Sequence, residues 1–341
     1  AATQRALHFY CVATSPLPTR SSFAARQIRG ELFRKQLPRP RCSRHPQFNS
    51  ILTAMTSPPD NSHRPLYHDV TKNFVYAFIY NHLYPAFCAL YAWSVQGREN
   101  VPVSKDARVL FVGYHSTHNW DIMLTGMTIR EIMDEVPVGL MHRTLVTCSP
   151  WLKAFGCIQG TRANALAAYE RGHRACMVIP GGAEEALAGH ENAYTVNWKS
   201  SKGHLRKGFA ELAIEADAVI VPVVVRNMQE MVFNPIFFVL NVTYLSKAYD
   251  YLIAAPGIVG WLFLQIKMWL WMMSAMLLVI PIPVKVTVIL GKPLRHEKDE
   301  SAEHFAVRVA NAYATLMEKT NPGGLNYTRA LRDRFATLKS N

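Results

Sequence analysis

The stretch that most constrains the fold covers residues 109–121, where a short apolar run stops at a glycine and continues into a loop that contains histidine. The run 108–112 is apolar and β-branched enough to predict a buried strand, which Gly113 ends. His115 follows this glycine closely, and a carboxylate, Asp121, comes six positions after it. Sites in α/β proteins lie at the carboxyl ends of strands, so this loop is a candidate site.

His115 and Asp121 have the residue types of a general-base pair. A carboxylate that holds one ring nitrogen of a histidine lets the other nitrogen take a proton from a hydroxyl or a thiol. A loop histidine beside a helix-capping aspartate explains the same two residues without any chemistry. This stretch alone leaves both interpretations open.

His118 lies three residues from both His115 and Asp121, which makes it an accessory candidate. Three interpretations stay open: an exposed loop histidine, a residue that orients an acceptor, or a metal ligand together with His115 and Asp121. Mixed His and Asp ligation with an open position is typical of hydrolytic zinc sites, so the third interpretation predicts a metallohydrolase. It leaves the motifs later in the chain unexplained, and the sequence shows no motif for a fourth ligand.

Three further motifs follow the histidine stretch. A tight glycine turn with an arginine at the start of a helix is able to hold a phosphate or a carboxylate, although a lone arginine also serves in surface ion pairs. Two glycines after a proline give close access to the backbone, and acidic residues suit the dipole of the helix that follows. The motifs are Gly160-Thr161-Arg162, then Pro180-Gly181-Gly182 with Glu184 and Glu185, then Lys207-Gly208-Phe209 ahead of a strand that contains Pro222.

Strand and helix signals alternate along the middle of the chain, which predicts a three-layer α/β sandwich with a largely parallel central sheet flanked by helices. At 341 residues, half of them apolar, the chain has the size of one catalytic domain with attachments, and we assign this domain to residues 96–338. Further strands are expected at 137–141, 157–159, 175–179, 219–225 and 284–290, and helices at 122–133, 163–172, 205–216 and 303–318.

Residues 1–54 differ in composition from the rest, with nine Arg or Lys residues against a single Glu. They carry +8 of the formal net charge of +13. A nucleic-acid-binding protein spreads its basic residues over a folded face, so this concentration predicts no nucleic-acid partner. The first methionine is Met55. We therefore interpret residues 1–54 as untranslated or upstream sequence, a targeting segment or a disordered leader, and residues 55–73 as a flexible polar segment.

Two apolar segments are membrane candidates. Residues 74–95 carry no formal charge but are interrupted by Asn81, His82 and Pro85, which favours a helix in the membrane interface over a clean span. Residues 251–283 hold a single formal charge, Lys267, and are expected to form a membrane-embedded insertion. The prolines of this second segment predict a bent or re-entrant element instead of a straight span.

In order and spacing, the four motifs resemble the sequence blocks of the glycerolipid acyltransferase superfamily, the enzymes similar to lysophosphatidate acyltransferase. The common superfamily spacing puts four residues between the histidine and the aspartate. Here five residues separate His115 from Asp121, as in the transmembrane-protein-68-like and diacylglycerol acyltransferase branches. The resemblance covers roughly residues 95–335 and includes the tail that begins Asn321-Pro322-Gly323-Gly324.

The resemblance implies an acyl-CoA-dependent O-acyltransferase that needs no cofactor or metal. His115 matches the family's catalytic base and Asp121 its partner, so the acyl group passes directly from acyl-CoA to an acceptor hydroxyl. Backbone amides of the His115 loop or of Gly181 and Gly182 are candidates to stabilise the oxyanion. By their place in the matched blocks, the substrate-binding candidates are Gly160, Thr161, Arg162, Pro180, Gly181, Gly182 and Glu185, and the accessory candidates are His118, Glu184, Lys207 and Pro222.

Members of the superfamily that recognise a phosphate carry an arginine where Glu184 stands. A carboxylate there repels a phosphomonoester, which favours a neutral glycerolipid acceptor and di- or triacylglycerol as product. A lysophospholipid acyltransferase is the alternative within the class, and a non-enzymatic membrane scaffold the alternative outside it. The resemblance further implies a bilayer as partner and an endoplasmic-reticulum membrane location with a cytosol-facing catalytic domain.

Overall fold

The computed structural model describes residues 70–339 except 103, 105, 119, 143–145, 147–149, 187–192, 201–202 and 254. The expected leader, residues 1–54, and residues 55–69 of the expected polar segment lie outside the described residues. Within the described part of the chain, most of the expected strands and helices are present.

A sheet of seven strands forms the centre of the fold, in the order β1-β9-β6-β2-β5-β3-β4. Neighbouring strands run parallel except β6 and β9, which are antiparallel. This confirms the expected α/β class with a largely parallel sheet. The strands are β1 (Ser94–Gln96), β2 (Val109–Val112), β3 (Val138–Met141), β4 (Cys157–Gln159), β5 (Ala175–Val178), β6 (Val219–Arg226) and β9 (Thr287–Leu290).

The middle strands are apolar along their whole length because helices cover both faces of the sheet. All four residues of β2 are buried, and only the last residue of β6, Arg226, is partly exposed. Pro222 stands inside β6, where a proline cannot donate a ladder hydrogen bond. The ladder to β9 starts only at Val223, and beyond it the Gly291 amide donates to the Pro222 carbonyl at 2.8 Å. Pro222 therefore lies at an interruption of the antiparallel pair, so its missing donor leaves no ladder bond unmade.

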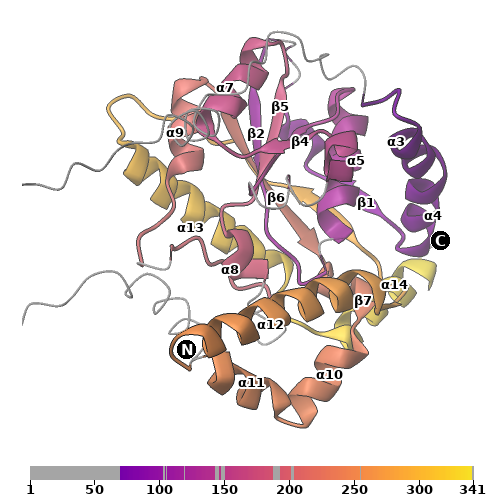
Figure 1. Ribbon diagram of the computed structural model, residues 1–341. Coiled ribbons are helices and arrows are strands. Elements are labelled where there is room, and N and C mark those ends of the chain that lie inside the picture. The colour runs from indigo at the N-terminus through magenta and orange to yellow at the C-terminus, as the bar shows by residue number, and fades with distance from the viewer. Residues whose placement is uncertain are drawn as a thin grey trace, which may run out of the picture. The chain divides into compact units, whose positions relative to one another are not determined.

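Helices lie on both sides of the strands (Figure 1). On one side are α7 (Arg162–Glu170), α9 (Gly208–Glu215) and α13 (Ala302–Thr320), and on the other is α5 (Trp120–Met133). All four were expected, and their ends differ from the expected ones by no more than three residues. The shorter helical pieces are η3 (Arg98–Asn100), η4 (Pro150–Phe155), α8 (Gly182–Ala186) and η6 (Gln229–Met231).

Helix α13 shows why these helices pack on the sheet. The Ser301 hydroxyl caps its first turn by accepting from the His304 amide at 3.2 Å. Phe305, Val309, Tyr313 and Met317 recur every fourth residue along one face and are all buried. The Tyr313 hydroxyl also donates to the Val223 carbonyl of β6 at 2.8 Å, which fixes the helix against the central strands.

The first apolar segment is shorter than expected and packs on the domain. It forms α3 (Phe74–Phe78), a π-helical turn η2 (Ile79–Leu83) and α4 (Tyr84–Leu90), whereas a single helix over residues 74–95 was expected. That expectation is wrong at its end, because residues 94–96 are strand β1, paired with β9. Tyr76 and Tyr84 are buried while Phe74 is largely exposed. One face of the segment therefore belongs to the core, and the described residues leave its role at a membrane untested.

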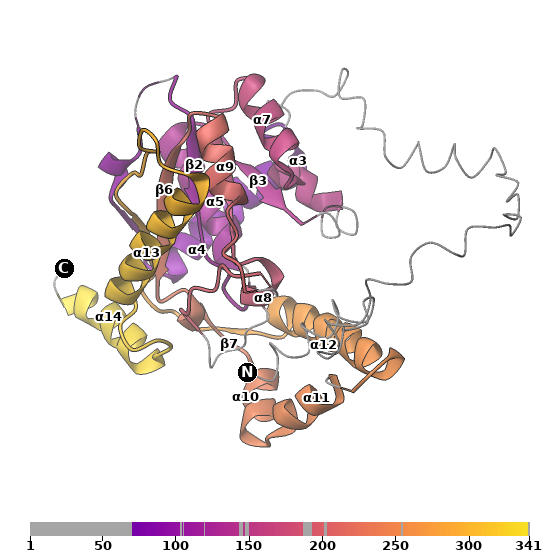
Figure 2. The same cartoon turned by 90° about the vertical axis from the view of Figure 1, so that its left-hand side faces the viewer.

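The second apolar segment is part of a longer helical excursion. It consists of α10 (Pro235–Val242), α11 (Leu245–Ile253) and α12 (Ile258–Leu277), which lie together beyond β7 in Figures 1 and 2. The helical structure is interrupted between α11 and α12, so the expected bend is present. A short antiparallel ribbon joins the two ends of the excursion, because β7 (Val232–Phe233) pairs with β8 (Ile280–Pro281).

Membrane embedding of this excursion is not confirmed by the structure. Within the described residues, no helix combines the length and the apolar character that crossing a membrane requires.

The final helix, α14 (Tyr327–Lys339), was not expected from the sequence. It lies beside α4, where Arg334 donates to the Ala89 carbonyl at 3.4 Å.

Candidate active site

Three loops meet at the carboxyl ends of the central strands. Strand β2 pairs in parallel with β5 on one side and β6 on the other, so Val112 faces both Val178 and Pro222. The segments that follow β2 and β5 therefore leave the sheet side by side, whereas β6 continues four residues beyond Pro222 before its turn begins. We call residues 114–118 the histidine loop, residues 180–182 the Pro-Gly-Gly loop and residues 227–231 the β6 turn.

Glu185 ties the histidine loop to the Pro-Gly-Gly loop. Its Oε2 accepts from the His115 amide at 3.1 Å, and its Oε1 accepts from the Asn197 amide at 3.2 Å. The residue is only 2% exposed. Burial raises the pKa of Glu185 to about 8, against the lowering effect of these two amides and of Arg206. Glu185 thus holds the backbone of His115, and its expected contact with substrate stays a prediction.

Gly181 is required by this arrangement. A Cβ atom at this position would lie 2.2 Å from the Glu185 Oε2 atom and 2.6 Å from the Glu185 Cβ atom. Gly182 has a φ of +57°, in the region that favours glycine, and it begins α8. The pair of glycines therefore brings the Glu185 carboxyl under the histidine loop.

Arg206 closes the other side of the Pro-Gly-Gly loop. Its guanidinium donates to the Pro180 carbonyl at 2.8 Å and to the Gly181 carbonyl at 2.6 Å. The Gly182 amide donates to the Ile179 carbonyl at 3.2 Å. In this conformation the amides of Gly182 and His115 are both engaged within the protein. Their expected use as oxyanion donors would therefore need these bonds to open.

Asp121 lies in the first turn of α5 and is 3% exposed. The Ser116 hydroxyl, from the histidine loop, donates a short hydrogen bond to Asp121 Oδ1. Burial raises the pKa of Asp121 to about 7, and the Ser116 hydrogen bond and the amides of the helix start oppose this rise. The site therefore contains a carboxyl that changes its charge near neutral pH, and a serine that the sequence analysis did not single out.

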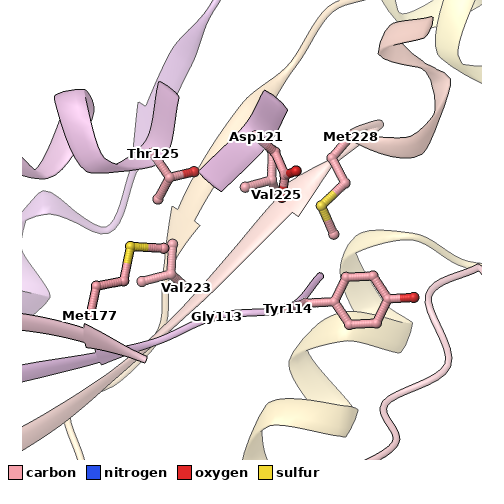
Figure 3. A pocket seen from close by; sticks show the side chains of 8 residues that line it. All are labelled: Gly113, Tyr114, Asp121, Thr125, Met177, Val223, Val225 and Met228. Atoms are coloured by element: carbon pink, nitrogen blue, oxygen red, sulfur yellow. The ribbon is translucent and has the colours of Figure 1, made fainter. Parts of the chain in front are cut away.

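A small pocket lies beside Asp121. The centre of a water molecule can occupy a volume of about 10 Å³ in it, so the pocket has room for about one water. Its walls come from α5, β5, β6 and the start of the histidine loop (Figure 3). They are mostly apolar, which accounts for the desolvation of the carboxyl. The lining residues are Gly113, Tyr114, Asp121, Thr125, Met177, Val223, Val225 and Met228.

His118 is buried, at 1% exposure, so its interpretation as an exposed loop histidine is wrong. Its Nε2 lies 2.6 Å from the Met228 carbonyl, and its Nδ1 accepts from the Trp120 amide at 3.2 Å. This pair of contacts fits the tautomer that carries its proton on Nε2, because a carbonyl accepts and an amide donates. Both ring nitrogens therefore serve the fold of the loop.

The same contacts argue against a metal cluster of His115, His118 and Asp121. Neither ring nitrogen of His118 offers a lone pair to a cation while these hydrogen bonds are kept. Among the residues that the structure describes, no group of three or more His, Cys, Asp or Glu side chains is arranged to hold a metal ion. The metallohydrolase interpretation has no support in this geometry.

The Gly160-Thr161-Arg162 motif lies apart from the histidine loop. It follows β4, three strands from β2 in the sheet, which corresponds to about 14 Å between strand axes. Thr161 caps α7 by accepting from the Asn164 amide at 3.2 Å. Arg162 is 53% exposed and pairs with two carboxylates of α9, Glu211 at 3.1 Å and Glu215 at 3.3 Å.

Lys207, another accessory candidate, is also outside the loop cluster. Lys207 is half-exposed and lies 3.8 Å from Glu211, while its neighbour Arg206 is the residue that reaches the Pro-Gly-Gly loop. The Glu184 side chain lies outside the described residues. Pro222 lies inside β6, where it is paired with Val112 of β2.

The β6 turn is the part of the site that sequence reasoning missed. The Thr117 amide and hydroxyl both donate to Gln229 Oε1, at 3.2 Å and 3.0 Å. Tyr194, whose hydroxyl also contacts the β6 turn, donates its amide to the Tyr114 hydroxyl at 3.0 Å. The position of Gln229 just after an expected buried strand was an available signal, because that strand shares its carboxyl edge with β2.

Taken together, the parallel sheet, the histidine and aspartate at the end of β2, and the Pro-Gly-Gly loop at the end of β5 have the layout expected of a glycerolipid acyltransferase. A sequence model of the family described as diacylglycerol acyltransferase matches residues 138–321, more than half of the 341 residues. The chain therefore belongs to the diacylglycerol acyltransferase family. This confirms the resemblance to the glycerolipid acyltransferase superfamily, because the matched family is itself named for acyltransferase activity.

Curated relatives carry the name "DGAT1/2-independent enzyme synthesizing storage lipids". The protein from Mus musculus is 26% identical over 253 residues, which cover 72% of this chain and 65% of the relative. The protein from Homo sapiens is also 26% identical, over 72% of this chain and 67% of the relative. The chain thus spans about 65% of the length of the mouse relative.

Among solved structures, the chain is similar to the 1-acyl-sn-glycerophosphate (LPA) acyltransferase PlsC from Thermotoga maritima. The sequence identity is 14% and the TM-score 0.43, over 80% of this chain and 88% of that one.

Proposed function

We propose that this protein transfers a fatty acyl group from acyl-CoA to the hydroxyl of a neutral glycerolipid, monoacylglycerol or diacylglycerol, and so makes di- or triacylglycerol. The observation that carries the proposal is the site at the end of β2. There the His115 backbone is fixed by Glu185, and the Asp121 carboxyl lies buried in the first turn of α5, six residues further along the chain.

In the proposed reaction, His115 takes the proton from the acceptor hydroxyl as its oxygen attacks the thioester carbonyl. The carbon–sulfur bond then breaks, and the CoA thiolate recovers the proton from the imidazolium. Asp121, when ionised, orients His115 and stabilises the imidazolium. Ser116 holds this carboxylate through its hydroxyl. Direct transfer of this kind needs no side-chain nucleophile and routes no step through a metal.

The neutral acceptor is supported by two considerations. Glu184 places a carboxylate where phosphate-recognising members of the superfamily carry an arginine, and a carboxylate repels a phosphomonoester. The names of the curated relatives also refer to storage lipids.

Exposed apolar side chains support a lipid surface as a partner, because both acyl groups of the reaction dissolve in a bilayer. Large apolar residues are exposed on α3 and across α10, α11 and α12, which is unusual for a surface that meets only water. The proposed location is the endoplasmic-reticulum membrane, with the catalytic domain facing the cytosol. The exposed residues include Phe74, Phe78, Phe238, Val242, Tyr251, Ile258, Trp261 and Trp269.

The test is an acyl-transfer assay with the full chain in membranes that lack background activity. Labelled long-chain acyl-CoA is supplied with monoacylglycerol, diacylglycerol, a long-chain alcohol or lysophosphatidate in parallel. We expect label in di- or triacylglycerol, and a loss of about 1,000-fold in the His115→Ala variant, since a general base contributes 10²–10⁴-fold.

Each other outcome has a defined meaning. Label in phosphatidate would keep the transferase and replace the neutral acceptor with a lysophospholipid. Full activity of His115→Ala would remove the base from the proposal. Loss of activity on addition of a chelator would return the metal-dependent alternative.

A further inference from the structure

The histidine loop is held not only by Glu185 but also, from the opposite side, by the β6 turn. Thr117 contributes two donors to Gln229 Oε1, and His118 Nε2 contacts the Met228 carbonyl at 2.6 Å. Gln229, Met228 and His118 are all buried. Of the three buried residues that follow His115 in its loop, two, Thr117 and His118, thus contact the β6 turn.

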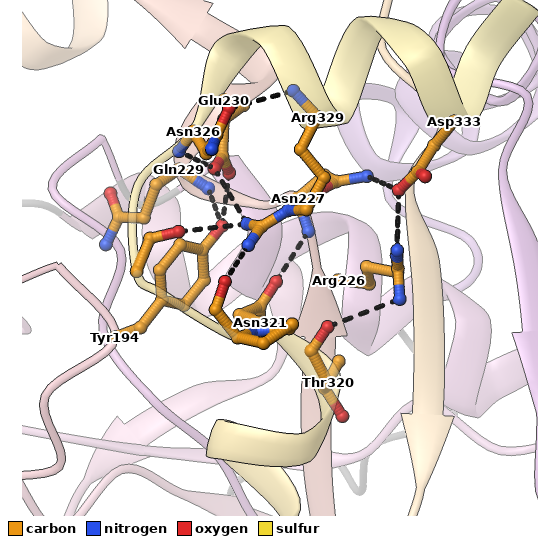
Figure 4. Close-up of polar contacts among 12 residues, drawn as sticks. Tyr194, Arg226, Asn227, Gln229, Glu230, Thr320, Asn321, Asn326, Arg329 and Asp333 are labelled. Atoms are coloured by element: carbon orange, nitrogen blue, oxygen red, sulfur yellow. Dashed lines mark hydrogen bonds and ion pairs between the residues drawn. The ribbon is translucent and has the colours of Figure 1, made fainter.

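The β6 turn is itself held by the C-terminal segment, which we define as residues 321–333. Glu230 is completely buried and accepts from the Asn326 amide at 2.7 Å and from Arg329 Nη2 at 3.3 Å. The Tyr194 hydroxyl donates a further, short hydrogen bond to Glu230 and accepts from the Gln229 amide at 3.0 Å. Figure 4 shows these contacts converging on the turn.

A second set of contacts fixes the first residue of the turn. Asn227 has a φ of +59°, and its amide donates to Asn321 Oδ1 at 3.0 Å. Its side-chain amide donates to the Lys285 carbonyl at 2.9 Å and to Asp333 Oδ2 at 3.1 Å. The backbone of the turn therefore leaves β6 in a conformation that the C-terminal segment helps to set.

We propose that Gln229 and the Glu230–Arg329 ion pair are positioning residues for the histidine loop, through which the C-terminal segment holds His115 in place for acyl transfer. This inference rests on the proposed function and adds to it the residues that fix the geometry of the base. No residue of the set touches the reacting atoms in the proposal. Each acts through the next, from Arg329 to Glu230, to Gln229 and to Thr117.

Physical chemistry favours a rigid link of this kind. A fully buried carboxylate is tolerated only when it is paired and hydrogen-bonded, so Glu230 has one well-defined position set by its three donors. Gln229 accepts two hydrogen bonds on one oxygen, which orients its side chain and, with it, the loop backbone at Thr117. Small displacements of a catalytic group lower the rate strongly while substrate binding changes little.

The first test replaces Gln229 by methionine, which keeps the side-chain volume and removes the acceptor. We expect Gln229→Met to lower kcat about 30-fold, with the KM for acyl-CoA and for the acceptor within twofold of wild type. Hydrogen exchange of the backbone amides over residues 114–118 should become about tenfold faster, because the Thr117 amide loses its partner. A kcat within threefold of wild type, or unchanged exchange, would overturn the inference.

The second test addresses the ion pair. Arg329→Met leaves a buried charge without its partner and is at risk of not folding, so the double variant Glu230→Gln with Arg329→Met is made beside it. We expect the double variant to fold and to lose kcat about tenfold, and Arg329→Lys, which keeps the charge, to recover most of that loss. A folded double variant with wild-type kcat and wild-type exchange in the histidine loop would contradict the link.

Arg308→Met is the matched control. Arg308 also makes an ion pair, with Glu300 at 2.6 Å, but this pair lies on α13 and the loop before it, with a partly exposed arginine. We expect no change in kcat or in exchange of the histidine loop. Failure of the wild-type protein to transfer acyl groups would sink the proposed function alone, because the exchange measurement still decides whether these residues fix the loop.

Discussion

The loops at the carboxyl edge of the sheet differ in how they hold their polar residues. Around His115, buried side chains hold the backbone through hydrogen bonds: Glu185 accepts from the His115 amide, and Gln229 accepts from the Thr117 amide. After β4, the outermost strand, the Gly160 turn is an ordinary helix start, and Arg162 forms ion pairs at the surface. The difference teaches that matching a family motif does not place its residues in one site.

The two regions should therefore respond differently to substitution. Changes near His115 should act mainly on the rate of transfer, because in the proposed reaction they move groups beside the reacting atoms or change their charge. Changes at the Gly160 turn should act on stability or on the affinity for the donor.

The largest effect is expected at Asp121. Asp121→Asn should lower kcat by about 10³–10⁴-fold, since a neutral amide no longer stabilises the imidazolium. Because burial raises the pKa of Asp121 to about 7, the wild-type carboxyl takes up a proton as the pH falls through this value. Wild-type kcat should therefore fall about tenfold between pH 8 and pH 6 through this group alone.

A pH series of steady-state acyl transfer, for wild type and Asp121→Asn, measures both effects. Asp217→Asn is the control, because Asp217 is exposed and lies at the amino end of β6, away from the loops. An Asp121→Asn variant that keeps the wild-type rate and the wild-type pH dependence would assign the chemistry to another group.

The next effect compares one substitution at two glycines. In Gly181→Ala the new Cβ would lie 2.2 Å from Glu185 Oε2, so the carboxyl that holds the His115 amide must move. We expect kcat to fall about 100-fold, the usual consequence of a misplaced catalytic group. In Gly160→Ala the Cβ meets backbone atoms of residues 140 and 141 at 3.1–3.2 Å, which a small shift can relieve.

Gly160→Ala should therefore cost about 1 kcal/mol of unfolding free energy and leave kcat within threefold of wild type. Thermal unfolding in detergent, run beside the transfer assay, separates the two quantities. Equal losses of kcat in the two variants would show that the Gly160 turn belongs to the same site as His115.

The smallest effect is expected at Arg162. Removing two surface ion pairs in Arg162→Ala should change the unfolding free energy by less than about 1 kcal/mol. If the arginine also contacts the CoA phosphates, the KM for acyl-CoA should rise about fivefold with kcat unchanged. Glu215→Gln, which removes only one of the carboxylate partners, is the control for the ion pairs. A KM equal to that of wild type would restrict Arg162 to its structural role.

Much of the fold could be predicted because its signals are local. The apolar runs of β2, β5 and β6 and the four-residue period of α13 are visible in the sequence, and the structure confirms them. Strand β1 is different, because it is only three residues long and follows shortly after α4. Its pairing with β9, almost 200 residues later in the chain, decides its conformation. No local pattern carries that information.

The candidate site divides in the same way. His115, Asp121 and Gly181 stand in motifs with recognisable chemistry, so the sequence was able to name them. The burial of His118 depends on the Met228 carbonyl, more than 100 residues away, and the role of Glu185 depends on the His115 amide. Such partners become visible only when the loops of different strands are brought together.

The short ribbon of β7 and β8 gives the helical excursion the character of a module. Its two ends pair at residues 232–233 and 280–281, a few residues along the chain from the place where β6 and β9 pair. The free-energy cost of pairing β6 with β9 therefore depends only weakly on the length of chain between these points, since loop-closure entropy grows only slowly with length. Insertions, deletions or exchange of α10 to α12 can therefore alter the exposed apolar surface while the loops of the candidate site keep their framework. The helical excursion can therefore change in sequence and length while the sheet that carries the candidate site stays the same.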